Sequence, residues 1–272
     1  MECNTRRGVL LDTAMKGEPL KGAHIIDCHA HLGPYNVFHI PHNDAEGMLK
    51  PMDKMGVQQA CISAIASIGP DYKLGNDLVA MAVKEHPERF IGYAVVNPNY
   101  PWDMEAELER CFHELGMRAI KLHTELHGYP IDGPNYRPAL EYANSNRLVV
   151  LSHGWGSPET LERLSQEYPG ANLIVAHGGA WNGRSPNRIL QIAKTRSNVF
   201  LDTAGSLVYL GGLEQLVKEV GAEKVLYGSD FPFQDSYAMM GGIIYAKISD
   251  ENKEKILGLN MANLLKTSGC LP

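Results

Sequence analysis

Two histidines near the start of the chain, His29 and His31, have a spacing that suits a metal site. An apolar run at 23–26 predicts a buried strand, and the glycine–proline pair at 33–34 ends it. Side chains alternate between the faces of a strand, so both imidazoles are expected on one face, together with Asp27. Neutral histidine is the commonest metal-ligating side chain, so the pair supplies half of a metal site. A hydrogen-bonded histidine pair in a loop is the alternative.

Further ligand-type residues stand at the ends of later apolar runs. Among the 11 histidines, His123, His153 and His177 each end a predicted strand, and His127 lies a few residues beyond His123. The last short run is followed by Asp230. Each residue alone could be a loop or turn residue with satisfied hydrogen bonds. Together they place ligand groups at the ends of several strands, which favours a shared site.

The elements that must position these residues alternate regularly along the chain. Short apolar or β-branched runs alternate with helical patterns, which predicts parallel β-α-β units. Eight units in about 250 residues match a (β/α)8 barrel, whose active sites lie at the carboxyl ends of the strands. The predicted strands are 23–28, 59–65, 90–96, 118–122, 147–152, 172–176, 198–202 and 224–228.

The sequence therefore predicts an α/β protein with one domain, a (β/α)8 TIM barrel over residues 23–272, after a lead segment of residues 1–22. A doubly wound open sheet is the competing fold. It would carry a glycine-rich turn after its first strand, where the histidine pair stands instead. No linker, repeat or low-complexity stretch divides the chain.

Composition excludes several classes of function. The chain has 272 residues, 44% hydrophobic and 21% charged, as in ordinary soluble globular proteins. A net charge of −6 gives no footprint for nucleic acid or an anionic membrane. No apolar run approaches the roughly 20 residues that span a bilayer. The 5 scattered cysteines argue against a disulfide framework or thiolate zinc site and for the cytoplasm. Cys28 is expected in the core, turned away from the histidines.

These motifs resemble those of the amidohydrolase superfamily, and in particular its amidohydrolase-2 group. That group contains metal-dependent TIM-barrel hydrolases and aminocarboxymuconate-semialdehyde-type decarboxylases, and often lacks the accessory β-sandwich of other members. Residues 256–265 are similar to its last helix, so the resemblance covers nearly the whole chain. The motifs that carry it are Asp27-x-His29-x-His31, Ile120-Lys121-Leu122-His123, Ser152-His153-Gly154, Ala176-His177-Gly178-Gly179 and Gly228-Ser229-Asp230-Phe231-Pro232.

The resemblance implies one divalent metal ion held by His29, His31, His153 and Asp230, with His177 beside it as an acid–base or orienting residue. Three imidazoles and a carboxylate suit Zn²⁺, which we expect first, or Mn²⁺ with more oxygen ligands. A catalytic metal lowers the pKa of bound water towards about 7. Asp230 is then expected to accept the water's proton and pass it to the leaving group.

Further residues are expected to contact the substrate. Lys121 and His123, which share strand parity, are both expected to contact the substrate, with Lys121 as a cation in the pocket. The alternative is a carboxylated Lys121 that bridges two metals, as in binuclear relatives. Loop aromatics such as Trp155, together with Arg184, would suit a small organic acid. Packing of loop against loop is the alternative for at least half of these rings.

Three functions remain open at this point. The first is a metal-dependent hydrolase that cleaves a C–O or C–N bond of a small, acidic ester, lactone or amide. The alternative is a non-oxidative decarboxylase of an unsaturated or aromatic acid. The third is a non-catalytic binding protein on the same barrel, although no expected ligand is missing. The expected partner is a small molecule, and a homo-oligomer stays open.

Overall fold

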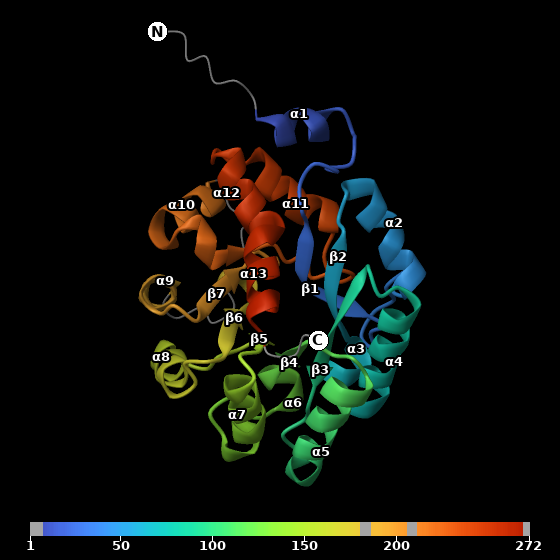
Figure 1. Ribbon diagram of the computed structural model, residues 1–272, viewed down its shortest axis with the longest axis vertical. Coiled ribbons are helices and arrows are strands. Elements are labelled where there is room, and N and C mark those ends of the chain that lie inside the picture. The colour runs from blue at the N-terminus through green and yellow to red at the C-terminus, as the bar shows by residue number, and fades with distance from the viewer. Residues whose placement is uncertain (1–7, 180–185, 206–210, 269–272) are drawn as a thin grey trace.

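Eight parallel strands form one barrel-shaped sheet in which each strand pairs with the next in sequence. The computed structural model describes residues 8–179, 186–205 and 211–268. Helices surround the strands on the outside (Figure 1). The predicted single-domain (β/α)8 barrel is confirmed, and among the described residues every strand belongs to this sheet. The strands are β1 (Ile26–Leu32), β2 (Gln59–Ala64), β3 (Phe90–Val95), β4 (Ala119–Leu122), β5 (Val149–Ser152), β6 (Asn172–Val175), β7 (Val199–Asp202) and β8 (Val225–Leu226).

Most of the longer helices lie between the predicted strands, as the alternating pattern of the sequence predicts, whereas the short α3 and α6 were not predicted. Helix α2, for example, begins after its N-cap Asp44, whose side chain accepts a hydrogen bond from Gly47 N. The α-helices are α1 (Val9–Met15), α2 (Ala45–Met55), α3 (Ile65–Ile68), α4 (Tyr72–Glu85), α5 (Met104–Glu109), α6 (Thr124–His127), α7 (Arg137–Ser145), α8 (Pro158–Glu167), α9 (Pro186–Thr195), α10 (Gly212–Val220), α11 (Ser236–Tyr245), α12 (Asp250–Glu254) and α13 (Asn260–Thr267). Short 3₁₀ or π segments are η1 (Pro101–Asp103), η2 (Arg110–Glu114), η3 (Pro134–Tyr136), η4 (Ala176–Gly179), η5 (Ala222–Lys224) and η6 (Lys255–Leu259).

The barrel closes where β1 meets β8 and the segment that follows it. Strand β8 has 2 residues, so most of this closure lies beyond its end. Cys28 N donates to Tyr227 O at 2.8 Å, and Asp230 N donates to His29 O at 2.8 Å. These bonds tie the first strand to a segment about 200 residues later in the chain.

A β-bulge interrupts β1 just before the histidines. Asp27 pairs with Ala60 of β2, but Ala30 already pairs with Ile62, so three steps along β1 oppose two along β2. A bulge of this kind breaks the strict alternation of side chains. The faces of residues 27–30 therefore cannot be read from sequence parity alone.

The bulge corrects two expectations about β1. Cys28 is fully buried, as predicted, but it lies in an inner cluster with Tyr93 and Leu151 that draws residues from every strand. It is therefore not turned to the outer side of the sheet. Asp27 instead lines a small cavity beside Met48 and Met52 of α2, so it does not share a face with the histidines.

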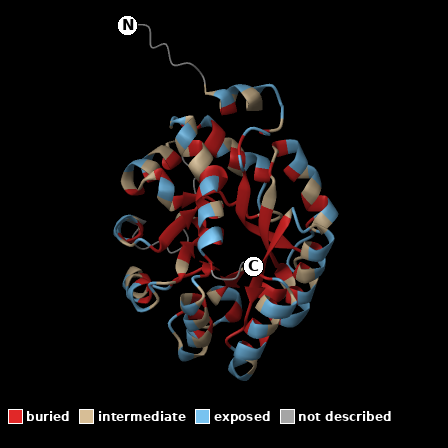
Figure 2. Ribbon diagram, in the orientation of Figure 1, coloured by how far each residue is buried: buried red, intermediate tan, exposed pale blue. Residues whose placement is uncertain are grey.

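The amino-terminal mouth of the barrel is sealed by the end of the chain. Met261, Leu264 and Leu265 of α13 belong to the inner cluster. Just before them, η6 runs close to β1, and a Cβ at Gly258 would lie 2.0 Å from His24 O. Figure 2 shows the resulting distribution, with buried strands inside and exposed surfaces on the helices. The amino-terminal mouth is therefore closed by packed side chains.

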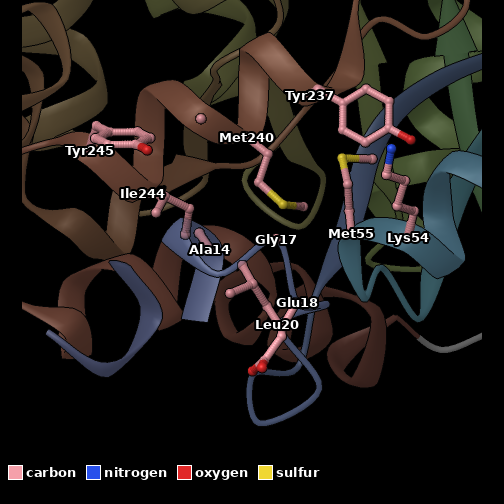
Figure 3. A pocket seen from close by; sticks show the side chains of 11 residues that line it. Ala14, Gly17, Glu18, Leu20, Lys54, Met55, Tyr237, Met240, Ile244 and Tyr245 are labelled. Carbon is pink, nitrogen blue, oxygen red and sulfur yellow. The ribbon is translucent and has the colours of Figure 1, made fainter. Parts of the chain in front are cut away.

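A groove of about 220 Å³ lies outside the barrel, where α1 and the loop after it meet α2 and α11 (Figure 3). Leu20, Met55, Met240 and Ile244 give it an apolar lining. None of the predicted site residues in the described part of the chain lines it. The division between a lead segment 1–22 and the barrel stays a prediction.

The described cysteines are buried free thiols at positions 28, 61 and 111. They form no disulfide with one another, in keeping with the sequence prediction; Cys3 and Cys270 lie outside the described residues. Within the described ranges, no helix combines the length and apolarity needed to cross a bilayer.

Replacement of Gly258 by alanine tests the sealed mouth. The new methyl group would collide with the backbone of His24, just before β1, and of Ile26 at its start, and overpacking of this kind costs about 1–3 kcal/mol. We expect Gly258→Ala to lower the free energy of unfolding by that amount in denaturant titrations. The matched control is Gly242→Ala in α11, where no atom lies within 4 Å of the new Cβ; alanine there should be neutral or stabilising by up to about 1 kcal/mol. Equal stabilities of the two variants would contradict the packing.

Candidate metal centre

Three of the predicted ligands converge at the carboxyl end of the barrel. His31 Nε2 lies 3.3 Å from Asp230 Oδ1, and His29 Nε2 lies 3.6 Å from the same oxygen. All three residues are buried, and their ligand atoms lie within 4.8 Å of one another. They come from β1 and from the segment after β8, so barrel closure brings them together.

The backbone at this rim holds two residues in an uncommon conformation. Asp230 has φ 58° and His177 has φ 57°, in the left-handed region that non-glycine residues seldom adopt. Such conformations persist only where the surrounding structure fixes them, and they cluster at functional sites. Both residues were predicted site residues on other grounds.

The opposite ring nitrogens of the β1 histidines are held by side chains on other strands. His29 Nδ1 donates to Asp202 Oδ2 at 2.8 Å, and His31 Nδ1 lies 3.0 Å from Ser63 Oγ. A carboxylate can only accept, so the proton of neutral His29 sits on Nδ1 and Nε2 keeps its lone pair. Partners of this kind orient the histidine ligands of metal sites.

His177 lies beside the three converging residues and is anchored in the same way. Its Nδ1 donates to Ala204 O at 2.8 Å, and its backbone N donates to Asp202 Oδ1 at 2.6 Å. Its ring centroid is 5.3 Å from that of His29 and 4.8 Å from that of His153. His177 therefore lies close both to His29 on β1 and to His153, which follows β5.

His153, the fourth predicted ligand, belongs to a neighbouring group. Its Nδ1 donates to Glu125 Oε2 at 2.9 Å, and its ring stacks on His123 at 4.2 Å. Ligand atoms of these three residues also lie within 4.8 Å of one another. However, His123 Nδ1 accepts a hydrogen bond from Leu126 N, so its lone pair caps α6. The contacts favour Glu125 as a partner that orients His153 rather than a second metal site.

Lys121 belongs to β4 and is fully buried. Its Nζ lies 2.7 Å from His29 Nε2, so the ammonium donates to the lone pair that a metal ion would use. Burial lowers the pKa of Lys121 to about 8, although the charges of Asp230 and Asp202 act in the opposite direction. His29, Asp230 and Asp202 thus attract the positive charge of Lys121. Side chains that attract one cation in this way are suited to bind a metal cation.

The protonation states also suit a metal ion. Burial lowers the pKa of His29 and of His31, so both imidazoles are neutral at pH 7. Burial alone would raise the pKa of Asp230, but its contact with His31 and its electrostatic interactions with His29 and His177 outweigh burial, and the pKa is lowered. Neutral imidazoles beside an ionised carboxylate are the forms in which these groups bind metals.

Two residues predicted to contact substrate need separate mention. Trp155 is fully buried in the main core, and its indole N–H donates to Ile174 O at 2.9 Å. It therefore packs inside the protein and does not line an open pocket, because its one polar atom is bound to the β6 backbone. Arg184 lies outside the described residues.

Three contributors were not singled out from the sequence. Asp202 is the last residue of a predicted strand, so the rule that located the histidines would also have found it. Glu125 follows His123 by two positions, but no spacing rule marks it. Ser63 lies within a predicted strand and carries no signal of its own.

The comparison with known protein families now adds to the geometry. A family model described as amidohydrolase, of the amidohydrolase-2 group, matches residues 26–267. The chain belongs to this amidohydrolase family. The resemblance noted in the sequence is therefore confirmed over nearly the whole barrel.

Two relatives and one solved structure are similar to this amidohydrolase. The 2-amino-3-carboxymuconate-6-semialdehyde decarboxylase of Dictyostelium discoideum is 26% identical over the matched region. That region covers 70% of this chain and 65% of the relative's length. The gamma-resorcylate decarboxylase of Polaromonas sp. is 23% identical over 79% of the chain and 85% of its own length. The 5-carboxyvanillate decarboxylase of Novosphingobium aromaticivorans, solved with manganese and a nitrobenzoic acid, shares the fold with a TM-score of 0.73, at 17% identity, covering 92% of this chain and 98% of that one.

These relatives correct the main functional expectation. They are decarboxylases, so hydrolysis of a C–O or C–N bond is contradicted and the alternative, non-oxidative decarboxylation, is better supported. The error has a physical reason. The motifs locate a metal-ligand set, and that set serves either reaction, whereas the bond that breaks depends on the bound substrate.

Replacement of Asp202 by asparagine tests the orientation of His29. The amide nitrogen would donate towards Nδ1 and drive the imidazole proton to Nε2, where it blocks a metal ion. We expect the affinity for Mn²⁺ to fall about 10–100-fold, as for other residues that orient ligands. Asp77→Asn, at a surface pair with Arg110, is the control. Unchanged binding by the Asp202 variant in chelator competition would refute the assignment.

Proposed function

We propose that this amidohydrolase is a metal-dependent, non-oxidative decarboxylase that releases CO₂ from a small unsaturated or aromatic carboxylic acid. The observation that carries the proposal is the convergence of His29, His31 and Asp230 at the carboxyl rim of the barrel, with their ligand atoms within 4.8 Å of one another. The relatives support the choice of reaction, because they are decarboxylases of such acids.

One divalent ion would be held by His29, His31 and Asp230, with His153 as the fourth ligand. The donor set fits, since the imidazoles of His29 and His31 are neutral and the carboxylate of Asp230 is ionised. The manganese in the 5-carboxyvanillate decarboxylase structure supports Mn²⁺, whereas Zn²⁺, expected first from the donor types, has no such support. When bound, the ion supplies positive charge for the oxygen atoms of the substrate.

The reaction needs no oxidant or reductant. The C–C bond to the carboxylate breaks, its electron pair stays on the substrate carbon, CO₂ leaves, and a proton joins that carbon. We assign the proton transfer to His177. Its Nδ1–H is committed to Ala204 O, which leaves Nε2 as the nitrogen that takes up and returns a proton.

Lys121 and His123 would contact the substrate. The Lys121 ammonium is a buried cation 2.7 Å from His29 Nε2 and would attract an anionic oxygen of the acid. His123 lies stacked on His153 at the same rim. A carboxylated Lys121 bridging two metals remains the alternative, and two metal ions per chain would favour it. The contact of Arg184 with the substrate, the formation of a homo-oligomer and the location in the cytoplasm stay predictions.

Product analysis decides between the two reactions. We expect Mn²⁺-loaded protein to release CO₂ from at least one acid in a panel of dihydroxybenzoates, carboxyvanillate and unsaturated dicarboxylates. Chelator should abolish the release and added Mn²⁺ should restore it. Cleavage of esters, lactones or amides without any CO₂ release would contradict the proposal.

His177→Asn separates proton transfer from metal binding. The variant should keep its metal ion but lose about 10²–10⁴-fold in kcat, the range for removal of a general acid–base group. His113→Asn is the control, since His113 is exposed and pairs with Glu109 on the surface. Retention of full kcat in the His177 variant would refute the assignment.

A further inference from the structure

Asp27, two residues before His29, is a buried carboxylate that faces away from the metal centre. It lines the small outer cavity beside α2, so it is not placed to act as a ligand. Its Oδ1 nevertheless accepts hydrogen bonds from His29 N and from Ser229 N, each at 3.0 Å. Its Oδ2 accepts a third hydrogen bond from Ser229 Oγ. The Asp27 side chain thus binds the backbone on both sides of the barrel closure. It contacts His29 N in β1 and Ser229 N, one residue before Asp230.

Ser229 extends this contact around Asp230. Its Oγ, besides donating to Asp27, accepts a hydrogen bond from Phe231 N at 3.0 Å. Phe231 O in turn accepts from His31 N at 2.6 Å. The residues on both sides of Asp230 are therefore fastened to β1.

The segment that carries Asp230 lies beyond the regular strand ladder and is held by individual hydrogen bonds, among them Asp230 N to His29 O and Gly228 N to Thr203 Oγ1. Strand β8 ends at Leu226, so the regular ladder stops well before the ligand. Asp230 itself holds a left-handed backbone with φ 58°, which needs fixing by its surroundings. Small displacements matter here, because a metal ion requires its ligands at defined distances.

We propose that Asp27 and Ser229 form a positioning clamp that sets the distance between the β1 histidines and Asp230. The clamp acts through the backbone and touches neither metal nor substrate. This inference rests on the proposed function only in so far as His29, His31 and Asp230 bind the metal ion. Its test reads metal binding, which is independent of the reaction catalysed.

The test compares Mn²⁺ affinity with the stability of the metal-free protein. Ser229→Ala removes the hydroxyl but keeps the backbone N–H, and Asp27→Asn keeps the side-chain shape but replaces one acceptor by a donor. Affinity is measured by competition with a chelator, and the ligand geometry by the EPR spectrum of bound Mn²⁺. The matched control is Ser67→Ala, which removes another fully buried hydroxyl that donates to a backbone carbonyl.

We expect Ser229→Ala and Asp27→Asn each to weaken Mn²⁺ binding by about 10–100-fold, with a changed EPR spectrum. Ser67→Ala should bind as the wild type does, even if its metal-free Tm falls equally. The double variant should lose less affinity than the sum of the two single losses, because both substitutions break the contact between Ser229 Oγ and Asp27 Oδ2.

Unchanged Mn²⁺ affinity in Ser229→Ala, with only a lowered Tm, would overturn the clamp and show a purely structural role. Additive losses in the double variant would also overturn the joint action. If Asp27→Asn fails to fold, Ser229→Ala alone decides. A wild type that binds Mn²⁺ but releases no CO₂ would refute the decarboxylase proposal and leave the clamp intact.

Discussion

The contact between β1 and the segment after β8 is the constraint on which the rest of the site depends. In a closed parallel barrel the carboxyl ends of all strands meet at one rim, so residues far apart in sequence become neighbours. Here the closure is made largely by single hydrogen bonds, such as Asp230 N to His29 O, because β8 is very short. The three converging ligands exist as a group only while this contact holds.

A second layer of contacts determines which atoms face the centre. Asp202 and Ser63 lie beside Nδ1 of the two β1 histidines, and Ala204 O accepts from Nδ1 of His177. Each of these buried partners has its own polar group hydrogen-bonded to the imidazole ring, so the contact leaves no buried polar atom unsatisfied. The result is a set of fixed imidazoles beside an ionised Asp230, with Lys121 as an internal positive charge.

Much of the fold could be predicted, because alternation and apolar runs reflect burial directly. All eight strands lie within a few residues of their predicted places, and the rim position of His29, His31, His177 and Asp230 followed from the ends of those runs. The face of Cys28 could not be predicted, since a bulge is a property of strand pairing and leaves no mark in one strand's sequence.

Other parts of the site depend on three-dimensional contacts that no local pattern records. Trp155 follows a strand end as the site residues do, yet its loop folds it into the core. Glu125 matters because α6 turns it towards His153. The motifs could not predict which bond the enzyme breaks either, because the same ligand set serves hydrolysis and decarboxylation. The comparison with the relatives corrected the prediction of hydrolysis.

The most direct test of the account is a crystal structure of the Mn²⁺-loaded protein with anomalous data collected at the manganese edge. We expect one strong anomalous peak per chain, within coordination distance of His29 Nε2, His31 Nε2 and Asp230, and with His153 as a further ligand. A peak at the His123–Glu125–His153 group alone, two peaks per chain, or no peak at the rim would contradict the single metal centre described here.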